Sequence, residues 1–270
     1  MPHGYNSMNE NGVFRRRDLP HIDVEGKPSF ITGCLDGSIS ASGLKRIREY
    51  RDSLNHKPCP KDLSRADWEL KKHKLVFKFV DSLLDRDSPI KYFTDDRLAE
   101  IVQNAFLHFA EERYHLYAFV VMPSHHHWLF LPKADWQESL ANNEMGKKPI
   151  RTPRESISHS IQSFTSNQCN RILGRTGSFW QTETFDHYAR NEAELYRINH
   201  YIEQNPVVAG LVTCAEKYRW SSAHIRLKLG LTPGEPIPKC GIGFQPVVNS
   251  KNTSQARSIC HDPGPESEKS

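Results

Sequence analysis

The spacing of hydrophobic residues predicts a short strand followed by two helices in the first third of the chain. Residues 28–35 (PSFITGCL) form an apolar run that ends shortly before Gly37, which is typical of a strand. Residues 38–54 and 66–84 are predicted to be helical, and the prolines between them break the chain. In the second helix the hydrophobic residues recur at helical spacing, which indicates a packing face.

A third helix and a hairpin are predicted in the middle of the chain. Thr94 is a good helix N-cap, and hydrophobic residues lie on one face of the segment from it to about Glu112. The segments 115–122 and 126–131 are short, apolar and rich in aromatic or β-branched residues, and Pro123 separates them. We therefore expect these two segments to pair as central strands.

Two more helices and one strand are predicted in the remaining half. A helix over 154–173 is followed by a turn and a strand between 174 and 187. The last helix starts after Asn191, which with Glu194 three residues later resembles a capping box. Pro206 is expected to end this helix.

This order of elements predicts an α+β fold. We expect a ferredoxin-like antiparallel sheet with helices packed on one face and a helical insertion, at about 39–90, after the first strand. The main domain is expected over 21–228. Residues 1–20 are interpreted as a mobile basic arm, or alternatively as a solvated tail without a role. Residues 229–270 are rich in Pro, Gly, Ser, Asn and Lys and are expected to be largely disordered.

Composition limits the class of protein and the nature of its partners. Of the 270 residues 37% are hydrophobic and 25% are charged, which suits a globular domain. The sequence contains no apolar run long enough for a membrane span or a signal peptide, so we expect a cytoplasmic protein. The six cysteines form no CxxC pair, which disfavours a zinc finger. A net charge of +4 permits a nucleic-acid partner without requiring one.

Three consecutive histidines begin the second strand of the predicted hairpin. Because alternate residues of a strand face the same side, His125 and His127 point together and His126 points away. Two imidazoles on one face can share a divalent metal ion. The simpler interpretation is a polar strand end in solvent, but the strand continues directly into the apolar residues of 128–131. The pair is therefore a candidate metal site.

A tyrosine and an amide lie together on the last predicted helix. Tyr201 and Asn205 are four residues apart and thus share a helix face. Tyrosine has a pKa of about 10 and is a poor nucleophile at neutral pH unless a metal polarises the phosphate that it attacks. Taken alone, Tyr201 is better explained as a packing residue at the edge of the hydrophobic stripe of this helix. By spacing alone, Tyr188 and Tyr196 are rival nucleophiles.

Several segments resemble a known family in the same order and spacing. YHLYAFVVMPSHHHWLFLP (114–132) resembles the HUH strand of the REP-associated tyrosine transposases, which are single-tyrosine HUH enzymes. GRTGSFWQTETFDHYAR (174–190) and YIEQNPVVAGLV (201–212) resemble two further motifs of this family, and WSSA (220–223) resembles a stretch that often follows them. The resemblance covers about 114–223, whereas the insertion and the tail add little to it.

This resemblance implies an activity and a set of functional residues. His125 and His127 would be metal ligands, Tyr201 the nucleophile, and Asn205 a further metal contact. The implied reaction is transesterification on single-stranded or hairpin DNA at palindromic repeats, through a 5′-phosphotyrosine intermediate, as in DNA transposition. Mg²⁺ or Mn²⁺ suits the phosphate oxygens. The resemblance further implies a nucleoid-associated protein that is a monomer or a homodimer.

The HUH strand departs from the family pattern at two positions. His126 stands where the family usually has an apolar residue, so its ring must find a hydrogen bond or lie near the surface. A shifted metal pair that uses His126 is an alternative, although strand geometry disfavours it. Ser124 replaces the usual Asn in the turn, which a serine can imitate.

Residues that contact DNA are predicted from basic and aromatic side chains near these motifs. A solvated charged face, or core packing for the tryptophan, explains the same residues equally well. The candidates are Arg15, Arg16, Arg17, Lys147, Lys148, Arg151, Arg154, Arg175 and Trp180.

Two other functions remain open at this point. The first is a DNA-binding regulator that keeps the fold and does not cut, which the intact His125, His127 and Tyr201 disfavour. The second is a metal-dependent nuclease that forms no covalent intermediate. A cleavage assay separates the regulator from the transposase. The second alternative predicts that a Tyr201→Phe variant still cuts, whereas the transposase predicts that this variant is inactive.

Overall fold

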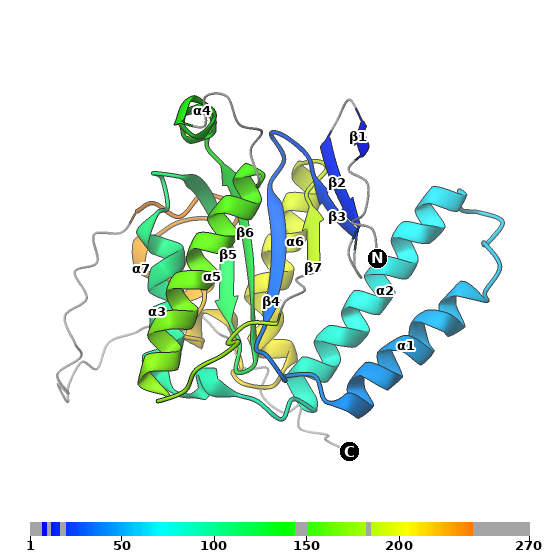
Figure 1. Ribbon diagram of the computed structural model, residues 1–270, viewed down its shortest axis with the longest axis horizontal. Coiled ribbons are helices and arrows are strands. Elements are labelled where there is room, and N and C mark those ends of the chain that lie inside the picture. The colour runs from blue at the N-terminus through cyan, green and yellow to red at the C-terminus, as the bar shows by residue number, and fades with distance from the viewer. Residues whose placement is uncertain (1–6, 10–11, 17–19, 144–150, 182–184, 240–270) are drawn as a thin grey trace, which may run out of the picture. The chain divides into compact units, whose positions relative to one another are not determined.

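A computed structural model describes residues 7–9, 12–16, 20–143, 151–181 and 185–239, which belong to one compact unit. Its centre is a four-stranded antiparallel sheet in the order β5-β6-β4-β7 (Figure 1). The strands are β4 (Ser29–Cys34), β5 (Tyr114–Val121), β6 (His125–Pro132) and β7 (Phe185–Tyr188).

Seven α-helices and a second sheet surround these strands within the described residues. The helices are α1 (Ala41–Asn55), α2 (Arg65–Arg86), α3 (Asp96–His108), α4 (Ala134–Asn143), α5 (Pro153–Ile172), α6 (Glu192–Val208) and α7 (Ser222–Leu229). The second sheet is antiparallel and has the order β1-β2-β3, with β1 (Ser7–Asn9), β2 (Gly12–Arg16) and β3 (Pro20–Asp23). The predicted α+β fold class is confirmed: β4, α3, β5, β6, α5 and β7 follow one another in the ferredoxin-like order, with α1 and α2 inserted after the first strand.

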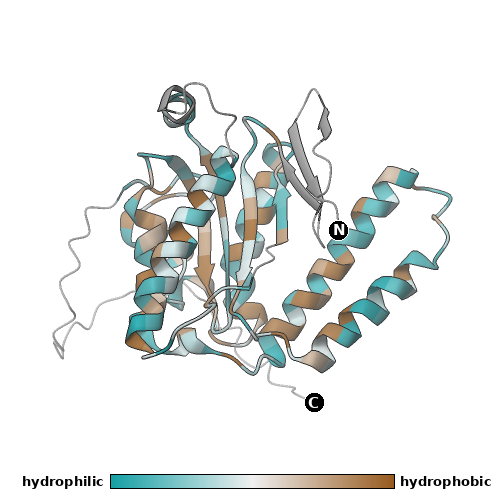
Figure 2. Ribbon diagram, viewed as in Figure 1, coloured by the Kyte–Doolittle hydropathy of each residue, from teal (hydrophilic) through white to brown (hydrophobic). Residues whose placement is uncertain are grey.

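The two faces of the central sheet are covered by different helices, so the expectation that helices pack on one face is wrong. On one face, Phe106 of α3 stacks on Trp128 of β6, and α3 packs beside α5. On the other face, Phe77 of α2 and Ile202 of α6 pack with Leu129 of β6 in one apolar cluster. Figure 2 shows the hydrophobic residues concentrated along β5 and β6. Alternate residues of β6 therefore enter two separate layers.

The N-cap predicted the start of α6 correctly, whereas the proline did not mark its end. Asn191 is the N-cap of α6 as predicted, and its side chain accepts a hydrogen bond from the Glu194 amide at 2.9 Å. The prediction that Pro206 ends α6 is wrong, because the helix continues to Val208. A proline in the last turn removes only one N–H donor, while its own carbonyl still accepts from the Leu211 amide at 2.9 Å.

The third helix starts later than its sequence indicates. Asp95 is the N-cap of α3, and its carboxylate accepts from the Arg97 amide at 3.0 Å. Thr94 instead closes the short 3₁₀ helix η1 (Tyr92–Thr94), and α3 ends at His108. The N-cap of α3 is therefore Asp95 and not the neighbouring Thr94.

Both ends of the described chain carry more structure than the sequence indicates. The expected basic arm contains β1 and β2, which pair with each other. Past the predicted domain end at 228, Gly230 caps α7 in the left-handed conformation. Ile237 is fully buried, and its amide donates to the Leu116 carbonyl of β5 at 2.7 Å. The described residues up to Lys239 thus pack on the domain, and the remainder of the predicted tail lies outside the described residues.

Gly33 and His126 fit each other across the central strands. The two residues are paired in the register of β4 and β6. The imidazole of His126 lies against Phe106 and Trp180, on the face covered by α3. A Cβ atom at Gly33 would lie 2.4 Å from the Nε2 atom of His126, so the glycine makes room for the histidine ring.

We predict that Gly33→Ala lowers the free energy of unfolding by about 1–3 kcal/mol, because the added methyl group overpacks this layer. In a His126→Val background the same change should cost much less, since the smaller side chain leaves room for the methyl group. Urea unfolding of the wild type, both single variants and the double variant measures this coupling. An equal cost of Gly33→Ala in both backgrounds would contradict the proposed steric fit.

Candidate functional site

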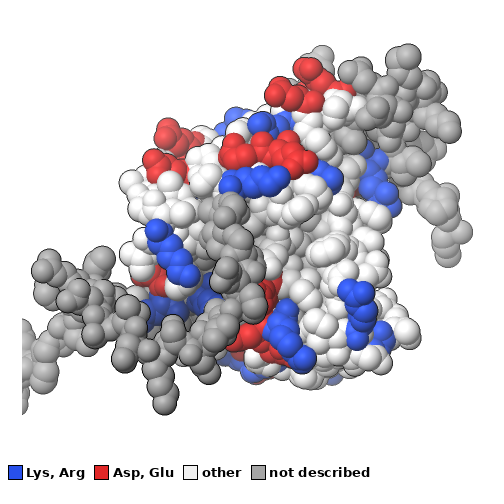
Figure 3. Space-filling model, turned by 90° about the vertical axis from the view of Figure 1, so that its left-hand side faces the viewer, with Lys and Arg blue, Asp and Glu red and all other residues white. Residues whose placement is uncertain are grey.

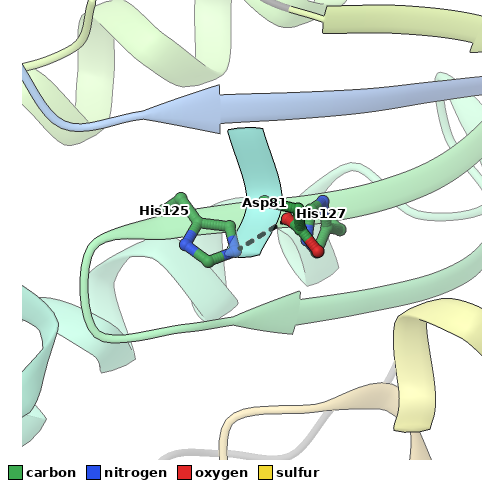
Figure 4. Close-up of side chains that lie close together, drawn as sticks. All are labelled: Asp81, His125 and His127. Carbon is green, nitrogen blue, oxygen red and sulfur yellow. Dashed lines mark ion pairs between the residues drawn. The ribbon is translucent and has the colours of Figure 1, made fainter. Parts of the chain in front are cut away.

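Three buried side chains from two elements form a group that can hold a metal ion. His125 and His127 are the first and third residues of β6, and Asp81 comes from α2 (Figure 4). The Oδ1 atom of Asp81 lies 3.1 Å from Nε2 of His127 and 3.5 Å from Nε2 of His125. One ligand atom of each residue lies within 4.8 Å of the others. Two imidazoles and a carboxylate are ligands that divalent transition-metal ions, Mn²⁺ among them, accept.

The neighbours of the two imidazole rings orient their Nε2 atoms toward Asp81. The hydroxyl of Ser124 donates to the Leu84 carbonyl at 3.0 Å and lies 3.1 Å from Nδ1 of His125. Since the hydroxyl proton is used, Ser124 accepts from Nδ1–H, which leaves the lone pair of the ring on Nε2. Thr32 of β4 occupies the same place at Nδ1 of His127, at 2.7 Å.

Several buried acceptor atoms of this group have no hydrogen-bond donor among the described residues. They are Nε2 of His125, Oδ1 of Asp81, Oδ1 of Asp85 and Oδ1 of Asn205. Asp85 lies one helical turn after Asp81, and its Oδ1 atom is 4.0 Å from Nε2 of His125. Buried polar atoms without partners are costly. Because all four are acceptors, a cation is the partner that fits them, and the residues present suit a divalent metal ion.

The predicted tyrosine and amide of α6 face the same group. The hydroxyl of Tyr201 donates a short hydrogen bond to Oδ2 of Asp81. The amide nitrogen of Asn205 donates to the same Oδ2 atom at 3.3 Å and lies 3.3 Å from Nε2 of His127. The ring of Tyr201 meets Phe30 and Phe77 edge to face. One carboxylate therefore connects the histidine pair to the tyrosine.

The rival tyrosines lie elsewhere. Tyr196 is 47% exposed on α6 and comes close to Gly234. Tyr188 ends β7, and its ring stacks against that of His187. Of these tyrosines, only Tyr201 hydrogen-bonds a member of the histidine group in the described part of the chain. The geometry thus favours Tyr201 as the candidate nucleophile.

Burial and local charge set the protonation states of the site. Burial, together with the neighbouring His127, lowers the pKa of His125 to about 3, although Asp81 opposes this shift. Burial alone would raise the pKa of Asp81, but the nearby histidines and the hydrogen bonds hold that pKa well below its usual value. A neutral imidazole and an ionised carboxylate are the forms that bind metals.

The other acid and the tyrosine are shifted in the opposite direction. Burial and the charge of Asp81 raise the pKa of Asp85 to about 7. Burial, followed by the charge of Asp81 and its hydrogen bond, holds the pKa of Tyr201 far above its usual value. Tyr201 is therefore a neutral phenol in the protein without metal.

The alternative metal pair with His126 is not formed, because His126 lies in the other layer. Its ring packs against Phe106 and Trp180. Burial, and then the neighbouring histidines, lower its pKa well below the usual value, so the ring is neutral. Its Nδ1 atom has no hydrogen-bond partner among the described residues. The histidine thus fills a position that suits an apolar side chain.

Three of the predicted DNA contacts lie in or near packed regions. Arg154 is buried, and its guanidinium pairs with Asp186 at 2.8 Å. Trp180 is buried, and its indole N–H donates to the hydroxyl of Thr165 at 3.0 Å. The indole is thus part of the core, as its simpler interpretation expected. Arg175 donates to the hydroxyl of Tyr92 at 2.9 Å.

The remaining predicted contacts are exposed or lie outside the described side chains. Arg151 is exposed. The side chains of Arg15 and Arg16, and the whole of Arg17, Lys147 and Lys148, lie outside the described residues. On the face drawn in Figure 3, lysine and arginine side chains lie next to aspartate and glutamate side chains. Contact with DNA stays a prediction for all of these positions.

Sequence reasoning missed Asp81 and Asp85. Both lie on α2, in the segment whose hydrophobic spacing predicts a packing face. The available signal was an acidic residue among the apolar residues Val80, Leu83 and Leu84, since an ionised side chain is rarely buried without a partner. The partner itself comes from β6 and could not be read from this helix alone.

The similarity of this chain to known proteins is to a solved structure. No family model and no curated protein matches this chain. A solved structure described as a REP-associated tyrosine transposase bound to a REP hairpin is similar, with 16% identity over 88% of this chain and 95% of the other and a TM-score of 0.42. A similarity of this degree does not assign a function. Among the described residues, no helix is both long and apolar enough to cross a membrane.

We predict that Mn²⁺ stabilises the protein through this site. A metal at about 100 times its dissociation constant adds about 2.7 kcal/mol, which for a domain of this size raises Tm by roughly 5–11 °C. Asp81→Asn should abolish most of the rise, because it removes the only ionised ligand of the group. Differential scanning calorimetry with and without Mn²⁺ measures the effect.

Asp36→Asn is the matched control, since Asp36 is exposed and lies outside this group. It should retain the full rise. Equal rises in the wild type and in Asp81→Asn would locate metal binding elsewhere.

Proposed function

We propose that this protein is a single-tyrosine HUH nuclease that cuts and rejoins single-stranded DNA, with the activity of a transposase. The observation that carries the proposal is the position of the Asp81 carboxylate. Its Oδ1 atom lies beside the Nε2 atoms of His125 and His127, and its Oδ2 atom accepts a hydrogen bond from the hydroxyl of Tyr201. A nucleophile is thus held next to a group that suits a phosphate-activating metal.

Different residues of the site would bind the metal ion and position the nucleophile. His125, His127 and Asp81 would hold a divalent ion, Mg²⁺ or Mn²⁺. The side-chain oxygen of Asn205 has no hydrogen-bond partner among the described residues and would be a further ligand. The metal would polarise the scissile phosphate and offset the charge that develops on it. Asp81 and the aromatic rings around it hold the hydroxyl of Tyr201 in one position.

The proposed reaction conserves phosphodiester bonds. The hydroxyl oxygen of Tyr201 attacks a phosphorus atom, the bond from phosphorus to the 3′ oxygen breaks, and a 5′-phosphotyrosine forms. The phenol loses one proton and the released 3′ oxygen gains one, so the protonation balance is zero. Attack by another 3′-hydroxyl reverses the step and rejoins the strand. No nucleotide cofactor is required.

The substrate class is supported by the sequence motifs alone. The segments around His125, Tyr201 and 174–190 resemble those of enzymes that act on DNA hairpins at palindromic repeats. We therefore propose single-stranded DNA with a hairpin as the substrate and the nucleoid as the place of action. The site itself would cut any DNA single strand whose backbone phosphate reaches the hydroxyl of Tyr201.

We predict that the wild type forms a covalent adduct with DNA and that Tyr201→Phe does not. The protein is mixed with Mn²⁺ and a pool of oligonucleotides in which a hairpin carries randomised single-stranded flanks. Because a 5′-phosphotyrosine keeps the 3′ fragment, DNA labelled at its 3′ end should migrate with the protein on a denaturing gel. DNA labelled at its 5′ end should instead give a shorter free strand with a 3′-hydroxyl.

Tyr196→Phe is the matched control, since it removes a hydroxyl from the same helix outside the site. It should form the adduct normally. Cutting without an adduct, retained in Tyr201→Phe, would show a metal-dependent nuclease without a covalent intermediate. Binding without cutting by the wild type would show a DNA-binding protein of the same fold.

A further inference from the structure

Helices α2 and α6 lie side by side and run in the same direction past the candidate site. The Nζ atom of Lys74 on α2 lies 3.3 Å from the Oε1 atom of Glu194 on α6. Seven residues further along each helix, Asp81 accepts the hydrogen bond from Tyr201. Equal steps between two contacts mean that the helices are parallel and in register. Their line of contact therefore leads from Tyr201 toward the starts of both helices.

The outer side of this line of contact is where a substrate can reach Tyr201. This residue is partly exposed, whereas His125 and His127 are fully buried. On its inner side the tyrosine ring meets Phe30 of β4 and Phe77 of α2, so the packed core closes that direction. A DNA strand therefore brings its phosphate to the hydroxyl from the outer side of α2 and α6.

Three lysines follow the line of contact on α2. Lys71, Lys74 and Lys78 are all exposed, and Lys78 lies three residues before Asp81. The steps of three, four and three residues from Lys71 to Asp81 place all four on one side of the helix. Lys74 is engaged by Glu194, whereas Lys78 forms no ion pair with any described residue. An unpaired cation thus lies within one helical turn of the carboxylate that holds the nucleophile.

Arg197 is the corresponding basic residue of α6. It is exposed and lies four residues before Tyr201, on the same side of the helix. Its Nε atom donates to the carbonyl of Ala193 at 3.2 Å, and the guanidinium has no acidic partner among the described residues. Glu194 does not neutralise it, because Arg190 at 2.8 Å and the lysine of α2 already hold that carboxylate. The two helices therefore each place an unpaired positive charge next to Tyr201.

We propose that Lys78 and Arg197 bind backbone phosphates of the DNA strand on one side of the phosphate that is cut, the side toward the starts of α2 and α6. Charge complementarity carries this assignment, because a single strand presents one negative charge per nucleotide to two cations that the protein leaves unpaired. The inference rests on the proposed function, since it assigns one flank of that substrate to a surface. It gives the insertion a role in placing the strand over Tyr201.

The test measures binding of a fluorescent hairpin oligonucleotide with single-stranded flanks by anisotropy at several salt concentrations, in EDTA so that no cutting occurs. Lys78→Gln and Arg197→Gln should each weaken binding and lower the slope of log Kd against log salt by about 0.7, the value for one phosphate contact on a single strand. The double variant should lower the slope by about 1.4, because the two contacts are separate. An unchanged slope in both single variants would overturn the proposal.

Lys45→Gln is the matched control, since it removes one positive charge from an exposed position on α1, in the same insertion. It should keep the slope of the wild type. Lys78→Arg and Arg197→Lys retain the charge and should keep that slope as well. An equal fall in Lys45→Gln would show that only the net charge is measured, and a fall in the two charge-retaining variants would show a structural role. Either result overturns the proposal.

Replacing single phosphates locates the contacts. An oligonucleotide that forms the covalent adduct gives the position of the cut, and uncharged methylphosphonates are then placed one at a time on either side of it. On one side, a substitution should weaken binding by the wild type and have no further effect on Lys78→Gln, because the charge at the other end of the contact is already gone. Equal losses in both proteins at every position would overturn the contact with Lys78.

Failure of this surface and failure of the nuclease are distinguishable. The salt slopes are measured without metal and without cutting, whereas adduct formation is scored with Mn²⁺ on a denaturing gel. An adduct together with unchanged slopes in both glutamine variants overturns the surface and supports the nuclease. Lowered slopes without any adduct support the surface and overturn the nuclease.

Discussion

The carboxylate of Asp81 is the interaction on which the rest of the site depends. It comes from the insertion, and its two oxygens meet a histidine pair on β6 and a tyrosine on α6. Burying an ionised group is costly unless charge or hydrogen bonds compensate for it. Here His125 is neutral, and Asp85 adds a second acid to the same place. The group therefore contains more hydrogen-bond acceptors than the described residues satisfy, which suits a divalent cation.

The sheet keeps this polar group apart from the structural core by the alternation of its strands. His125 and His127 enter the layer of α2 and α6, whereas His126 enters the layer of α3 and α5 and is surrounded by aromatic rings. A shift of one residue in the register of β6 would exchange these layers. The fit between Gly33 and His126 opposes that shift, because Gly33 is the only glycine of β4. A packing detail on one face thus maintains the chemistry on the other.

Local periodicity was sufficient wherever the relevant residues belong to one element. The period of two along β6 separated His125 and His127 from His126, and the spacing of four along α6 placed Tyr201 with Asn205. The role of Asp81 could not be predicted, because it depends on how α2 packs on the sheet, and no pattern within a helix shows this. The end of α6 at Val208 and the burial of Ile237 could not be predicted for the same reason. Tertiary packing extends the helix past Pro206, and it buries Ile237 within a segment of polar composition.

Ser124 shows how a substitution in a turn connects these levels. In the resembling family an Asn usually stands here, and the sequence suggested only that a serine can form the same turn. In the structure its hydroxyl donates to the Leu84 carbonyl of α2 and accepts from the ring of His125. One hydroxyl therefore fixes the orientation of a candidate metal ligand and at the same time fastens the helix that supplies Asp81. Because the insertion and the histidine strand share this contact, the position of the carboxylate and the position of the imidazole cannot vary independently, and the ligands stay in one arrangement.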